Sequence, residues 1–521
     1  MERAHDTHEK SLVLALWSMF RVWHGLVILF SFVSLTATYR IWLHPLRKIP
    51  GPLLARATEL WRTSKYARGN WHDDILDLHR QYGPVVRIAP NEVSFVDKEA
   101  LVKVYGHSTG TRKTSWYDVW EVKGAGTSLF SATDPREHAF LRKRVATAYS
   151  MSTILSLEDK IQGIADVLWQ KLHDLAAQGE TVNVGDWTNY FAFDVVGKLG
   201  LGDSLGLVEH GRDVNDIVRS VHGFFYIWSN LGYLPGQKIW IENPLSQALS
   251  AILAPAWMLG FPKFSTWLGK QVADRMSEGE VKKRVPDMLD RFIEMKDPDG
   301  EQVRYPGVLV EAGNLLGAGG DTTAIAMAVV VGQLLVHPEM YRRVQDEIDG
   351  EYCKHEDDWK LDYRSAEALP WLHACIKEGT RMCPSILWQL PHEAPAEGIE
   401  IAGFDIPSTA TLSMSTISQN RCKDIWGDDA DEWRPSRWIV GEDGTTPEYL
   451  REIEKYNVLF GYGSRTCVGR NLAMVEVHKF VGQFLRHFDC ELVNPGQPFQ
   501  RRSQWFCVQE NLLVKLSSRS H

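Results

Sequence analysis

Long stretches with the apolar spacing of α-helices dominate the 521-residue chain. Short runs of β character occur at Val85–Ile88, Val93–Val96 and Ile399–Ala402. After the N-terminal region we find no internal repeat and no Gly/Ser-rich or charge-run boundary. The pattern therefore predicts one mainly α-helical domain with small β-sheets.

The first forty residues have a different pattern. Ser11 to Tyr39 is strongly apolar and is interrupted by Arg21 and His24. Its last part, Val22 to Tyr39, would form about 27 Å of helix, enough to cross a hydrocarbon core. A cleaved signal peptide would have a shorter apolar core and a small-residue cleavage site, and neither is evident in this segment. A buried N-terminal helix is the other alternative. We interpret the segment as a transmembrane signal anchor whose C-terminal body is cytosolic, although basic residues on both flanks leave the orientation open by charge alone.

A proline-rich segment follows the anchor. Pro45, Pro50 and Pro52 fall within eight residues, which stops a helix from continuing into the body. The segment is either a hinge that sets the pose of the body on the bilayer or a plain linker. We expect three parts: residues 1–40 as membrane anchor, 41–58 as linker and 59–521 as the globular domain.

Composition narrows the class of protein. Hydrophobic residues make up 44% and charged residues 24%, which excludes a disordered or coiled-coil chain. The net charge of −9 argues against nucleic-acid binding. The seven cysteines form no CxxC pair, so a disulfide scaffold or a structural zinc site is not expected, and the thiols indicate a reducing compartment.

The strongest chemical signal is the segment FGYGSRTCVG at 460–469. It puts Cys467 among glycines just before a helical pattern at Arg470–Phe488. The helix dipole at this position favours thiolate, and the glycines let the backbone pass close to a flat group. Such a site suits a metal with one soft anionic ligand, of which haem iron is the leading example. A structural cysteine in a tight turn is the alternative.

These residues resemble the haem-binding loop of the cytochrome P450 monooxygenases, and YRIWLHPLRKIPGP resembles the linker of their membrane-bound fungal members. The resemblance implies a P450-like fold, mainly α with small β-sheets, with residues 59–521 as the haem-thiolate catalytic domain. It implies that Cys467 ligates the iron of haem b, Arg465 pairs with a propionate and Phe460 packs near the sulfur. Gly469, the last fixed position of the loop, is also expected at the cofactor.

A second pattern lies between Pro306 and Pro338, where 31 residues rich in Ala, Gly, Val and Leu predict a long buried helix. Its middle reads Ala318-Gly-Gly-Asp321-Thr322-Thr323. The glycines and a threonine that bonds back to the carbonyl four residues earlier predict a local distortion. A packing-driven glycine patch is the alternative. By the resemblance, Asp321 and Thr322 are the catalytic proton-delivery pair over the distal face of the haem.

Three further groups of residues take roles from the same resemblance. Glu378 and Arg381 are spaced i, i+3 and imply a buried structural network with Arg437. His138 and Arg142, spaced i, i+4, are expected at a propionate, with an exposed basic face as the alternative. His392 stands where many members have a propionate-binding arginine, and it could donate one hydrogen bond there with a charge that depends on pH. Lys143, Arg144, Arg470 and Lys479 form either a docking patch for an acidic reductase or a solvated face.

The expected function is a monooxygenase that uses dioxygen on a hydrophobic small molecule, in fungal secondary metabolism. The sequence has no dinucleotide-binding motif or flavin domain, so electrons should come from an NADPH–cytochrome P450 reductase, with the enzyme anchored in the endoplasmic reticulum membrane. A haem-thiolate isomerase or dehydratase and a haem sensor are the rivals; Asp321–Thr322 argues against the first, and the lack of a signalling domain argues against the second. Pocket walls are expected from 108–130, 314–318, 385–389 and 501–507.

Overall fold

The computed structural model describes residues 2–107, 109, 111–121, 126–234, 236–237, 239, 243–246, 248, 260–277 and 286–519. Residues 108, 110 and 122–125, at one expected pocket wall, lie outside this set. Helices dominate the described chain and strands are short, which confirms the predicted fold class.

The helices begin and end as follows: α1 Glu2–Thr38, α2 Leu53–Ala57, α3 Leu60–Arg68, α4 Trp71–Tyr82, α5 Lys98–Tyr105, α6 Pro135–Val145, α7 Met151–Leu155, α8 Glu158–Gln178, α9 Val184–Leu201, α10 Leu207–His210, α11 Ile217–Leu231, α14 Gly260–Ser277, α15 Met288–Ile293, α16 Tyr305–Leu335, α17 Pro338–Tyr352, α18 Tyr363–Ala368, α19 Pro370–Met382, α20 Thr416–Gln419, α21 Lys423–Trp426, α22 Pro447–Tyr456 and α23 Arg470–His487. The strands are β1 Val85–Ala89, β2 Glu92–Phe95, β3 Thr181–Asn183, β4 His392–Glu393, β5 Ile399–Ile401, β6 Phe404–Ile406, β7 Thr411–Met414, β8 Phe488–Leu492, β9 Gln500–Ser503, β10 Cys507–Glu510 and β11 Leu513–Ser518.

The strands form small separate sheets rather than one large one. The four-stranded sheet has the order β1-β2-β7-β4, and the three-stranded sheet has the order β3-β11-β8. Two antiparallel pairs, β9–β10 and β5–β6, complete the set. The three predicted β runs coincide with β1, β2 and β5 to within two residues.

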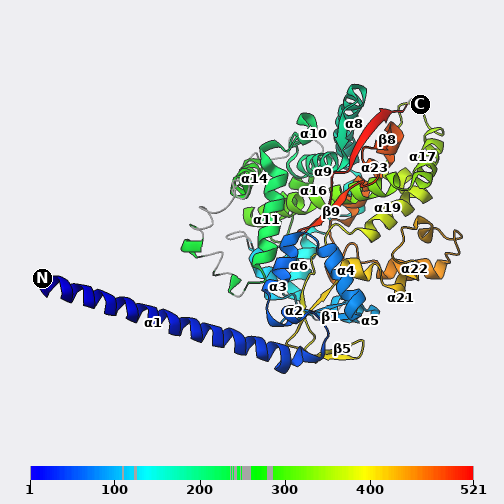
Figure 1. Ribbon diagram of the computed structural model, residues 1–521. Coiled ribbons are helices and arrows are strands. Elements are labelled where there is room, and N and C mark those ends of the chain that lie inside the picture. Colours follow the sequence, from blue (N-terminus) through cyan, green and yellow to red (C-terminus); the bar gives the residue numbers. More distant parts are fainter. Residues whose placement is uncertain are drawn as a thin grey trace.

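The N-terminal helix stands off from the body as a single rod (Figure 1). The apolar span runs over Met19–Leu43, which is 25 residues, because a π-helical turn at Tyr39–Leu43 extends α1. It is thus longer than the predicted 18 residues. None of the most apolar part of this span is buried. His24, which interrupts the apolar run, places its Nδ1 2.7 Å from the carbonyl of Phe20, so the helix itself pairs this polar group.

The proline-rich segment packs on the body. Leu46 and Ile49 are buried, and the N–H of Arg87 in β1 donates to the carbonyl of Pro50 at 2.7 Å. A Cβ on Gly51 would lie 2.3 Å from the carbonyl oxygen of Arg87, so only glycine permits this close approach. These contacts fix where the chain enters the four-stranded sheet.

Helix α16 forms the centre of the body and confirms the predicted 31-residue element. It is long and apolar enough to cross a membrane, but 78% of its apolar part is buried, so it is a core helix. It packs on α9, α19 and α23, and Figure 1 shows it running through the middle of the molecule. Pro306 in its first turn supports the start of the helix, and Pro338 begins α17 three residues after its end.

Candidate functional site

The loop before α23 has the tight backbone that its sequence predicts. The N–H of Cys467 donates to the carbonyl of Phe460 at 2.7 Å, which closes the loop. Gly461 and Gly463 have φ of +78° and +61°, where glycine is favoured. A Cβ on Gly463 would lie 2.1 Å from the carbonyl oxygen of Tyr105, so the loop also needs glycine for packing. Gly469 is the last residue before α23.

Cys467 is exposed to solvent. Desolvation raises the pKa of its thiol, and the backbone N–H groups of Gly469 and Arg470 oppose this rise. The expected pull of the helix N-terminus is therefore present but is outweighed in the chain alone. A bound metal cation would reverse the balance, because coordinated thiols are deprotonated outright.

A cluster of buried cationic side chains lies beside the loop, and it includes one residue that the sequence did not reveal. Lys113, His138 and His392 are only 7%, 4% and 3% exposed, and Arg465 is partly buried among them. Lys113 donates to the carbonyl of Phe130 at 2.5 Å and Arg465 to that of Ala132 at 2.8 Å. Within the described ranges, none of these four side chains has a carboxylate partner.

The electrostatics of this cation cluster fit an absent anionic group. Burial, followed by the neighbouring cations, lowers the pKa of His138 and of His392 to about 3 each. The same causes hold the pKa of Lys113 well below its usual value. With pKa values this low the two histidines are neutral in the chain alone, and a ligand that carries carboxylates would restore and pair the charge of the cluster. The two propionates of haem meet this requirement.

Arg142 lies one turn after His138 on α6, as predicted, but the two side chains have different partners. Arg142 donates to the carbonyl of Thr466 at 2.6 Å, directly next to Cys467. His138 lies in the cation cluster. His138 is therefore not part of an exposed basic face, which was the alternative, and Arg142 holds the cysteine loop in place.

The middle of α16 carries Asp321 and Thr322 on a continuous helix, without the predicted distortion. The Thr322 hydroxyl donates to the carbonyl of Ala318 at 2.8 Å, as expected. The glycines have a packing role: a Cβ on Gly319 would lie 2.8 Å from Val196, and one on Gly320 would lie 2.7 Å from the Phe193 ring. The glycine pair thus lets α9 approach α16 closely.

Asp321 is 1% exposed, and its side-chain partner is His222 of α11. Its Oδ1 forms a very short contact with Nε2 of His222, and its Oδ2 has no hydrogen-bond partner among the described residues. The two residues are 99 positions apart, and no local spacing in the sequence relates them.

The predicted network behind the site is present. Glu378, Arg381 and Arg437 are fully buried, and Glu378 accepts from Arg381 Nε at 2.8 Å and from Arg437 Nε at 2.9 Å. The indole N–H of Trp438 donates to the same carboxylate at 2.9 Å. Burial opposes the ionisation of Glu378, but the two guanidinium groups outweigh it and hold its pKa below the usual value.

The basic docking patch is smaller than the sequence suggested. Lys479 is 3% exposed and pairs with Glu158 at 2.9 Å, and Arg144 pairs with Glu311 at 3.0 Å. Both belong to the interior, so the prediction was wrong for these two residues. Lys143 and Arg470 are exposed.

Comparison with known proteins identifies the family of the chain. The sequence model of the cytochrome P450 family matches residues 50–516. The chain is 29% identical to the cytochrome P450 monooxygenase gsfF of Penicillium aethiopicum over 95% of this chain and 98% of that protein. It is 32% identical to a cytochrome P450 monooxygenase of Aspergillus terreus, over 85% and 90% of the two chains. It is also 29% identical to a pisatin demethylase of Fusarium vanettenii, over 91% and 90%.

Proposed function

Because this chain belongs to the cytochrome P450 family, whose cofactor is haem, we propose that it is a membrane-anchored monooxygenase that acts on a hydrophobic small molecule of fungal secondary metabolism. The observation that supports it most is the buried cation cluster of Lys113, His138, His392 and Arg465 beside the Cys467 loop. These side chains would hold the propionates, and Cys467 would hold the iron. When bound, haem supplies the activation of dioxygen from which one oxygen atom enters the substrate.

The chain's own residues would position the cofactor and manage protons. The Phe460 carbonyl closes the loop at the N–H of Cys467, and Arg142 braces the same loop through the Thr466 carbonyl. Gly469 would lie at the cofactor. Asp321 and Thr322 would hold and pass the protons that oxygen reduction consumes. The hydroxyl of Thr322 donates to a carbonyl of its own helix, which leaves its oxygen lone pairs able to accept a hydrogen bond from water.

An aromatic cluster supports a flat or ring-containing hydrophobic substrate. Trp120, Phe225 and Trp505 come from three separate segments, and their rings lie 5.1 to 5.4 Å apart. They belong to one cluster of apolar side chains with Ile325 and Val329 of α16, just after Thr322. Aromatic rings pair in stacked or edge-to-face arrangements, so a free face of this cluster would favour a substrate that contains a ring.

The partners and location follow from the family and from α1. Electrons would come from an NADPH–cytochrome P450 reductase, and Lys143 and Arg470 are the exposed residues of the former patch that it could contact. The apolar helix would anchor the enzyme in the endoplasmic reticulum membrane with its body in the cytosol. Residues 1–40, 41–58 and 59–521 would then serve as anchor, linker and catalytic domain.

The test is metabolite profiling of a deletion strain, followed by incubation of the accumulated compound with the full-length enzyme, reductase and NADPH. We expect a product one oxygen heavier, or its demethylated or desaturated descendant, with consumption of NADPH. Conversion without NADPH would instead identify an isomerase or dehydratase.

A further inference from the structure

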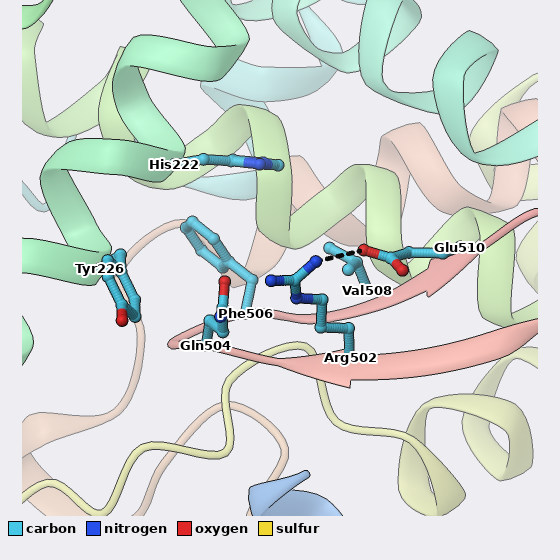
Figure 2. A pocket seen from close by; sticks show the side chains of 7 residues that line it. All are labelled: His222, Tyr226, Arg502, Gln504, Phe506, Val508 and Glu510. Carbon is cyan, nitrogen blue, oxygen red and sulfur yellow. Dashed lines mark ion pairs between the residues drawn. The ribbon is translucent and has the colours of Figure 1, made fainter. Parts of the chain in front are cut away.

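A pocket between α11 and the β9–β10 hairpin reaches His222, the residue that contacts the buried Asp321. It measures about 230 Å³ and is lined by side chains of α11 and of the β9–β10 hairpin: His222, Tyr226, Arg502, Gln504, Phe506, Val508 and Glu510. Figure 2 shows His222 above the hairpin and the Arg502–Glu510 ion pair, 3.6 Å long, across the pocket from it. His222 thus touches the pocket on one side and Asp321 on the other.

Asp321 depends on this contact for access to solvent. Its carboxylate is 1% exposed, whereas the side chain of His222 is 37% exposed. The hydroxyl of Thr322 donates to Ala318 rather than to Asp321, so it is not the donor that supplies the acid. Within the described part of the chain, the imidazole is the side chain that joins Asp321 to the pocket.

We propose that His222 is a positioning residue that takes protons from the pocket and passes them to Asp321. This inference rests on the proposed monooxygenase function. A proton leaves Nε2 for Oδ1 of Asp321, and Nδ1 keeps its own proton. The neutral ring then turns so that the freed nitrogen faces the pocket, where it takes up another proton from solvent. The net transfer is one proton from solvent to the acid, and dioxygen reduction consumes it.

The charges around His222 suit this role. Burial lowers its pKa, but the Asp321 carboxylate of α16, with a further contribution from Asp213 ahead of α11, raises it above the usual 6.5. Arg502 and Glu510 face the ring from the hairpin and neutralise each other. The nearby carboxylate therefore favours the protonated ring, which is the form that donates from Nε2.

The experiment uses full-length haem enzyme with reductase and NADPH and needs no substrate, since reduction of dioxygen to hydrogen peroxide consumes two protons for every NADPH oxidised. NADPH oxidation is measured from pH 6 to 9 in H₂O and D₂O for the wild type, His222→Gln and His222→Lys. Glutamine keeps an N–H donor but does not titrate, whereas lysine restores a titratable cation. His210→Gln, an exposed histidine at the end of α10, is the matched control.

We expect His222→Gln to slow NADPH oxidation at pH 7 by about tenfold or more, as for other positioned proton-transfer groups. Its solvent isotope effect should rise, and the decline of the wild-type rate above the pKa of His222 should disappear from its pH profile. His222→Lys should recover part of the rate, and His210→Gln should match the wild type. Equal rates, isotope effects and pH profiles in His222→Gln and an active wild type would overturn this inference alone. A wild-type enzyme that binds haem but accepts no electrons would overturn the proposed function and the inference together.

Discussion

Thr322 provides the sharpest test of chemistry at the scale of single residues. If its hydroxyl orders the water that delivers protons, Thr322→Ala should keep haem, substrate binding and NADPH oxidation. Product per NADPH should fall by about 10²–10⁴-fold, with hydrogen peroxide taking its place. Asp321→Asn should instead slow the whole cycle, because it removes the acid that His222 contacts. Unchanged coupling in Thr322→Ala with several substrates would remove Thr322 from the mechanism and revive the isomerase alternative.

Glu476 on α23 is a buried acid outside the site. Neither of its carboxylate oxygens has a partner among the described residues, and burial holds its pKa well above the usual 4.5. The folded chain therefore keeps this proton to a higher pH than the unfolded chain. The free energy of unfolding should fall as pH rises above 4.5, by up to about 1.4 kcal/mol per pH unit, until the folded pKa is passed.

Glu476→Gln removes this titration. Its melting temperature should equal that of the wild type near pH 4 and exceed it at pH 7 and 8, as measured by circular dichroism. Glu356→Gln, an exposed acid, is the control and should not change this difference. A Glu476→Gln variant that melts below the wild type at pH 8 would show that the carboxylate has a stabilising partner.

The residues of the candidate site differ in how well their roles can be predicted from the sequence. The Cys467 loop is predictable because its glycines, arginine and cysteine act within ten consecutive residues. Lys113 and His222 were missed because each gains its role from partners on distant segments: Lys113 from Arg465, and His222 from Asp321. Lys479 and Arg144 show the converse, because basic residues near the loop in sequence turn inward to Glu158 and Glu311.

At the scale of elements, periodicity predicts α16 well and its local shape poorly. The length of α16 follows from a long apolar run between prolines. Gly319 and Gly320, however, are required because a larger side chain there would clash with Val196 and Phe193 on α9. That constraint lies in the neighbouring helix, so the sequence of α16 alone left distortion and packing equally open.

The element with the clearest separate role is α1. Removing residues 1–40 should release most of the enzyme from membranes after carbonate washing, while the haem spectrum stays unchanged, because none of the most apolar part of Met19–Leu43 is buried against the body. Replacing Leu26, Leu29 and Phe32, all exposed, by Ala within the intact helix is a milder variant that should weaken membrane binding in part. An unchanged membrane fraction in the truncated enzyme would place the anchor elsewhere.

In the whole molecule, hydrogen bonds join the cysteine loop to segments more than 300 residues away in the sequence. Arg465 bonds to Ala132 and Arg142 to Thr466, so the two halves of the expected cofactor site are fixed to each other. The Glu378 network ties α19 to the segment that leads to α22. We propose that this arrangement holds haem with Cys467 as its thiolate ligand.

The reduced carbon-monoxide difference spectrum tests that claim most directly. The full-length enzyme should show the red-shifted Soret band of a thiolate-ligated haem, and Cys467→His should bind haem but lose that band. Cys422→Ser, at a partly buried cysteine outside the loop, should keep it. A Cys467→His enzyme that retains the red-shifted band would contradict the assignment of Cys467 and the site built around it.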